Sequence, residues 1–93
     1  MAPPLTIAGF QQHIREKYSK RDFERGTPAT FMWFVEEVGE LATALQDVDQ
    51  KNREEEFADV LAWLCTLANI NNVDLAKALD DKYFKDGGPK GYK

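Results

Sequence analysis

Glycine and proline lie almost entirely near the two ends of this sequence and at one point close to residue 27, with only Gly9 and Gly39 elsewhere. Because these two residues are the strongest helix breakers, the long middle of the chain is free to form helices. No stretch shows the alternation of apolar and polar residues that is typical of β-strands. The sequence therefore predicts an all-α fold. The glycines and prolines near the two ends and close to residue 27 are Pro3, Pro4, Gly26, Pro28, Gly87, Gly88, Pro89 and Gly91.

Apolar residues at steps of three and four predict helices at about 6–19, 28–47, 52–70 and 74–84. The polar residues 20–26, between the first two helices, are expected to form a connector. Thr27 and Pro28 suit the N-cap and first position of the second helix, and Asp74 suits the cap of the fourth. Four helices with short connections predict a four-helix bundle-type subunit.

The chain has 93 residues and a mass of 10.6 kDa, which is room for one domain. We expect residues 1–93 to form it, with a flexible C-terminal tail at 85–93. Five consecutive large apolar residues at 31–35 point in every direction around the second helix, so that helix must be covered on all sides. Because so short a chain supplies few partners of its own, we expect a homodimer or a homotetramer.

The overall charge and the cysteine content limit the classes of function. Twelve basic and 16 acidic residues give a net charge of −4, so there is no basic field to hold nucleic acid or an anionic membrane. The single cysteine, Cys65, cannot form an intrachain disulfide, and no apolar run approaches the roughly 20 residues of a membrane span. We expect a cytoplasmic protein that binds neither nucleic acid nor membranes.

The second predicted helix carries an unbalanced acidic cluster. Its only charged residues within 31–45 are Glu36, Glu37 and Glu40, with no Lys or Arg at helical spacing to pair with them. Steps of three and four residues place all three on one side of the helix. Carboxylates this close repel one another, so a cation is expected beside them.

The third predicted helix carries a second acidic pair, Glu56 and Asp59, again three residues apart. If the two helices are antiparallel neighbours, Glu37, Glu40, Glu56 and Asp59 converge on one point. Four carboxylates on facing helices form the kind of oxygen cage that Mg²⁺ or Mn²⁺ accepts. The alternative is two amphipathic helices with acidic faces that are simply solvated.

These acidic residues also match a known two-part signature, EExxE followed on the next helix by ExxD. Residues 36–40 read EEVGE and residues 56–59 read EFAD, within the strings FMWFVEEVGELATAL and EEEFADVLAWLCTLANINNVDLAKAL. The chain resembles the all-α nucleoside triphosphate pyrophosphohydrolases, specifically the short, single-domain members of the MazG-like group. The resemblance covers most of residues 27–84.

The resemblance implies hydrolysis of a nucleoside triphosphate, or its deoxy form, between the α and β phosphates to give a monophosphate and pyrophosphate. It implies dependence on Mg²⁺, with Glu37, Glu40, Glu56 and Asp59 as ligands. Glu36 or Glu37 is the candidate for orienting the attacking water, and the sequence does not choose between them.

Four further residues are candidates for substrate binding, and three of them have a structural alternative. Lys82, followed by Tyr83, matches a basic position of the family that helps with the phosphates, but it is equally an ordinary surface lysine. Many relatives carry further arginines beyond this point, and this sequence departs from that pattern. Asn72 is a candidate for the base or sugar, with helix capping as the stronger alternative. Trp33 is a candidate for stacking on the base, with core packing as the stronger alternative.

Two rival functions fit the same residues. A phosphoribosyl-ATP pyrophosphohydrolase uses the same helix pair on the same kind of bond, and only substrates separate the two. A non-catalytic oligomerisation or regulatory module that binds a cation predicts stabilisation by metal without turnover.

Overall fold

A computed structural model describes residues 4–87 of the chain. It contains three α-helices, α1 (Ile7–Leu45), α2 (Gln50–Ile70) and α3 (Leu75–Tyr83), followed by a short 3-10 helix, η1 (Lys85–Gly87). Residues 4–87 contain no strand, which confirms the all-α prediction. No helix in this range is long and apolar enough to cross a lipid bilayer.

Helix α1 joins the first two predicted helices, so the predicted connector at 20–26 was wrong. The chain stays helical up to a kink at Gly26, whose φ of 77° and ψ of 172° lie outside the helical region. Lys, Arg and Glu are good helix formers, so a polar segment does not by itself end a helix. The break is confined to the residue type that adopts positive φ most readily, and Pro28, which lacks an N–H, follows it. We call 7–25 the N-terminal limb of α1 and 27–45 its C-terminal limb.

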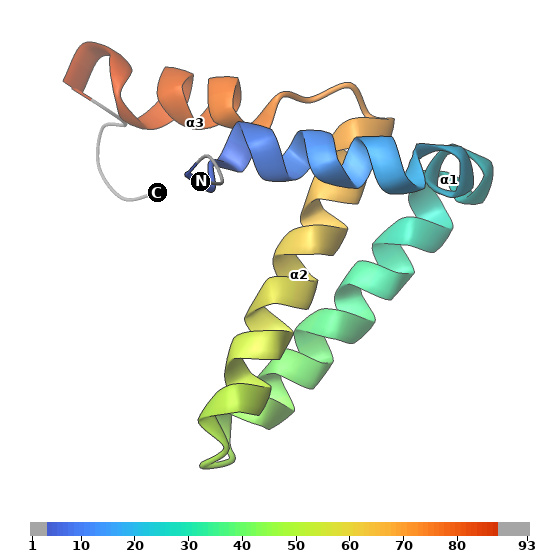
Figure 1. The fold of residues 1–93 in the computed structure, drawn as a ribbon, viewed down its shortest axis with the longest axis vertical. Coiled ribbons are helices and arrows are strands. Elements are labelled where there is room, and N and C mark those ends of the chain that lie inside the picture. The colour runs from blue at the N-terminus through green and yellow to red at the C-terminus, as the bar shows by residue number, and fades with distance from the viewer. Residues whose placement is uncertain (1–3, 88–93) are drawn as a thin grey trace.

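The C-terminal limb of α1 and helix α2 form an antiparallel hairpin (Figure 1). At its closed end Asp49 caps α2, and Arg53 donates to the backbone carbonyl of Ala44 at 3.3 Å. Further along, the rings of Trp33 and Trp63 stack with centroids 6.2 Å apart and planes inclined by 15°. The antiparallel direction agrees with the prediction and sets acidic residues of the two helices opposite one another.

The N-terminal limb of α1 crosses the open end of this hairpin, with α3 beside it (Figure 1). Two buried amides hold the crossing together. Gln11 Nε2 donates to Asn69 Oδ1 at 2.9 Å and to the carbonyl of Val73 at 2.7 Å, while Gln11 Oε1 accepts the N–H of Leu75 at 2.9 Å. Because these bonds tie α1 to the end of α2 and the start of α3, they fix the position of the N-terminal limb.

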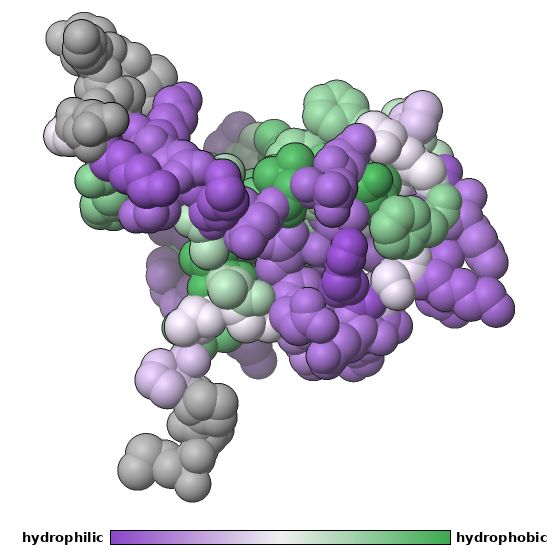
Figure 2. Space-filling view, turned by 90° about the horizontal axis from the view of Figure 1, so that it is seen from above, coloured by the Kyte–Doolittle hydropathy of each residue, from purple (hydrophilic) through white to green (hydrophobic). Residues whose placement is uncertain are grey.

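A single copy of the chain buries little apolar surface. Met32 is 73% exposed and Phe57 is 56% exposed, and apolar side chains reach the surface in the view of Figure 2. Residues 4–87 form three α-helices, the first of them kinked, and the predicted four-helix bundle is not confirmed. Among residues 4–87, the buried apolar residues are Ile14, Ala44, Cys65 and Ala68.

The predicted fourth helix agrees with the structure. The predicted fourth helix is α3, and its predicted cap, Asp74, accepts the backbone N–H of Lys77 at 3.1 Å. The tail expected to be flexible begins with η1, and residues 88–93 lie outside the described residues.

Candidate metal centre

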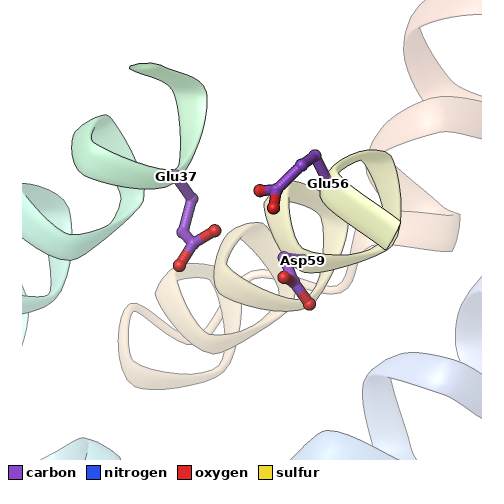
Figure 3. A group of neighbouring side chains, drawn as sticks. All are labelled: Glu37, Glu56 and Asp59. Atoms are coloured by element: carbon purple, nitrogen blue, oxygen red, sulfur yellow. The ribbon is translucent and has the colours of Figure 1, made fainter. Parts of the chain in front are cut away.

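Three carboxylates from two helices meet between α1 and α2 (Figure 3). Glu37 belongs to the C-terminal limb of α1, whereas Glu56 and Asp59 belong to α2 and are three residues apart. One oxygen of each side chain lies within 4.8 Å of the other two. The hairpin therefore brings together three of the four residues predicted to bind a metal.

Two of these carboxylates are partly buried without a compensating partner. Glu37 and Glu56 are half-buried and Asp59 is exposed. The Oε2 atoms of Glu37 and Glu56 are inaccessible to solvent and accept no hydrogen bond. Within the part of the chain that the structure describes, no Lys or Arg forms an ion pair with any of the three. Buried carboxylate oxygens without partners are costly, and a cation between them offsets that cost.

Burial and mutual repulsion raise the pKa of both half-buried glutamates. For Glu37 the main cause is loss of hydration, followed by the negative charges of Glu40, Asp59 and Glu56. For Glu56 the main cause is again loss of hydration, followed by the charges of Glu40 and Asp59. Both shifts have the direction expected for carboxylates forced together without a counterion.

The two remaining acidic candidates lie beside the group of three. Glu40 is exposed, yet its charge is the largest electrostatic contribution to the raised pKa of both Glu37 and Glu56. Glu36 is exposed, and its negative charge makes the smallest contribution to the raised pKa of Glu37. Glu40 and Glu36 therefore act on the charges of the group, but they lie outside the three carboxylates whose oxygens meet within 4.8 Å.

The predicted substrate-binding residues do not gather around the carboxylates in one copy of the chain. Trp33 precedes the cluster by one helical turn and stacks on Trp63. Asn72, with a positive φ of 57°, lines a separate cleft beside the N-terminal limb of α1. Lys82 lies near the end of α3, its Nζ 5.5 Å from the ring centroid of Tyr83. Helix α3 extends away from the middle of the hairpin (Figure 1).

Sequence reasoning missed Asp22, which is only 3% exposed. Asp22 pairs with Arg25 at 3.1 Å, and the Arg25 guanidinium lies 5.0 Å from the ring centroid of Trp63. The only signal in the sequence was an Asp and an Arg three residues apart, which is just as common on exposed helix faces. Nothing local marked Asp22 as buried, because its burial depends on the limb crossing α2.

Residues 25–85, about two-thirds of the sequence, match the MazG nucleotide pyrophosphohydrolase domain. The chain belongs to the MazG nucleotide pyrophosphohydrolase family. A comparison with curated protein sequences gives no match. The matched range of the MazG domain contains the C-terminal limb of α1 together with α2 and α3, and hence every carboxylate of the cluster.

The donor atoms of this MazG domain suit the divalent cations on which the family generally depends. The group consists of carboxylate oxygens alone, without histidine or cysteine. Oxygen-only sets favour hard cations such as Mg²⁺, Mn²⁺ and Ca²⁺ over Zn²⁺. An ion bound by Glu37 and Glu56 would compensate their two buried oxygens, which have no hydrogen-bond partner.

We expect Glu37→Gln to raise the melting temperature of the protein in chelator at pH 8 by a few degrees. Below its ordinary pKa of 4.5 the Glu37 carboxyl is protonated in both the folded and the unfolded chain, so the substitution changes little there. As the pH rises through the raised pKa of the folded state, the carboxylate destabilises the wild-type fold, and glutamine does not. The gain should therefore be present at pH 8 and nearly absent at pH 4. Thermal unfolding at both pH values tests this, and a gain of the same size at both would contradict it.

Proposed function

We propose that this protein hydrolyses nucleoside triphosphates or deoxynucleoside triphosphates between the α and β phosphates, giving a monophosphate and pyrophosphate in a Mg²⁺-dependent reaction. The main support is the meeting of Glu37, Glu56 and Asp59 within 4.8 Å on a MazG domain. Phosphoanhydride hydrolysis is chiefly a problem of positioning and charge neutralisation, which such a cluster with bound metal can provide.

In this proposal Glu37, Glu40, Glu56 and Asp59 bind the metal, for which Mn²⁺ is a possible substitute. A triphosphate is itself polyanionic, so it approaches an acidic cluster only when a cation lies between the two. Bound Mg²⁺ supplies charge neutralisation and lowers the pKa of water. Glu36 or Glu37 orients the attacking water. Glu36 is exposed at the edge of the cluster, which leaves its carboxylate available as a general base.

We further propose that the working form is a homodimer or homotetramer in the cytoplasm. The exposed apolar residues support assembly, because monomers rarely leave so much apolar surface in water. In such an assembly, Lys82 and Tyr83 of one copy can bind the phosphates of a substrate that lies at the acidic cluster of another copy. Trp33 and Asn72 remain candidates for contacts with the nucleoside. The free thiol of Cys65 is buried and suits a reducing compartment.

The direct test is pyrophosphate release from a panel of canonical, deoxy and modified nucleoside triphosphates. We expect release with Mg²⁺, at least a hundredfold less with excess chelator, and recovery when Mg²⁺ is restored. Phosphoribosyl-ATP belongs in the panel, because sole activity on it would assign the chain to the rival pyrophosphohydrolase. Stabilisation by Mg²⁺ without turnover on any substrate would instead identify a cation-binding module.

A further inference from the structure

A cleft of about 320 Å³ lies between the N-terminal limb of α1 and helix α2. Its volume falls in the range of small-molecule sites, roughly 300–1,000 Å³. Aromatic side chains line it from both elements, Tyr18 from α1 and Trp63 from α2. A cleft with aromatic groups on two walls suits a flat aromatic ligand.

Asp22 lines this cleft and has one carboxylate oxygen to spare. The Asp22 side chain is 4% exposed, and its Oδ1 accepts Arg25 Nη1 at 3.1 Å. Its Oδ2 is buried and has no hydrogen-bond partner. The same Arg25 Nη1 also donates to Thr30 Oγ1 at 3.4 Å, so this donor is already occupied. An N–H or O–H brought into the cleft would satisfy Oδ2.

The cleft and the acidic cluster share one face of α2. Ala62, Trp63 and Thr66 line the cleft, and they follow Asp59 by three, four and seven residues. Such steps keep residues on one side of a helix. Asp59 and Trp63 are one turn apart, about 6 Å along the axis. The cleft therefore begins about one helical turn from the cluster along α2.

Building on the proposed pyrophosphohydrolase function, we propose that this cleft binds the base of the substrate. We further propose that Asp22 selects bases with an amino group at C4 of a pyrimidine or C6 of a purine, which are cytosine and adenine. An amino group donates directly to Oδ2. A keto base such as uracil or hypoxanthine sets a carbonyl oxygen beside the buried carboxylate, where two acceptors repel and Arg25 Nη1 is already engaged. Asp22 precedes the matched range 25–85, so family membership does not assign it a role.

The test compares kcat/KM for two base pairs, CTP against UTP and ATP against ITP, in the wild type and in Asp22→Asn. We expect the wild type to favour the amino member of each pair by at least about tenfold. Asparagine keeps an acceptor for Arg25 but presents an amide donor to the base, so each preference should fall by about tenfold or more. Glu24→Gln is the matched control, because Glu24 is an exposed acid on the same limb outside the cleft, and it should change neither ratio. Unchanged ratios in Asp22→Asn, or an equal loss on all four substrates, would overturn the proposal.

A second measurement separates this proposal from the hydrolytic one. Cytidine and uridine carry no phosphate, so their binding in chelator, followed by saturation-transfer NMR, does not involve the metal centre. A preference for cytidine that is lost in Asp22→Asn supports the cleft even if no triphosphate is hydrolysed, whereas equal binding or none overturns it. If Asp22→Asn does not fold, Ala62→Met fills the cleft from α2 without touching the Asp22–Arg25 pair. Cytidine binding should then fall at least tenfold, and unchanged binding would overturn the proposal.

Discussion

Replacing Asp59 by asparagine is expected to lower kcat by at least about a thousandfold at saturating Mg²⁺. Asparagine has nearly the shape of aspartate but no charge, so one of the three clustered carboxylates is lost while the packing is kept. Asp59 is exposed, and the fold should therefore tolerate the change. Pyrophosphate release measures the loss, and circular dichroism with light scattering checks that helicity and mass are unchanged.

Neighbouring residues supply matched controls for the same experiment. Glu56→Gln should lose as much activity as Asp59→Asn, whereas Glu55→Gln, one position earlier on α2 and exposed, should stay within about twofold of the wild type. Glu40→Gln should give an intermediate loss, because Glu40 lies outside the group of three but acts on the pKa of two of its members. Wild-type turnover in Asp59→Asn would mean that the cluster is not the metal site.

The parts of the fold that follow from local chemistry were predictable from the sequence. Asp74 caps α3 as expected, and apolar spacing placed both α2 and α3 within about two residues of their observed bounds. The connector at 20–26 was mispredicted because its residues are polar but still good helix formers. Only Gly26 breaks the helix, and one residue of break yields a kink in place of a loop.

The acidic cluster was predictable because its members are regularly spaced on two helices joined by a short turn. An antiparallel hairpin leaves little freedom in how Glu37 faces Glu56 and Asp59. The cleft was not predictable, because it depends on how the N-terminal limb crosses α2. Hydrogen bonds between Gln11 and Asn69, which are 58 residues apart, stabilise that crossing. No local sequence pattern predicts such a pair.

If the protein assembles as proposed, Met32→Lys is expected to give a monomer with an intact subunit fold. Met32 is 73% exposed in a single copy, so lysine there meets only water and leaves the helix undisturbed. It lies on the C-terminal limb of α1, within the run 31–35 that is apolar on every side. If a second copy covers this run, the lysine ammonium is buried without a partner, which costs several kcal/mol and favours dissociation.

Val48→Lys is the matched control for this substitution. Val48 is also apolar and is 91% exposed, but it lies in the turn that joins α1 and α2, away from the apolar run. Light scattering and sedimentation should show the wild-type mass for Val48→Lys and the monomer mass for Met32→Lys. If the metal centre also needs a neighbouring copy, Met32→Lys loses turnover even though Glu37, Glu56 and Asp59 are untouched, and activity then rises with protein concentration. An unchanged mass for Met32→Lys would show that this run is not an interface, and that the exposed apolar surface must serve another contact.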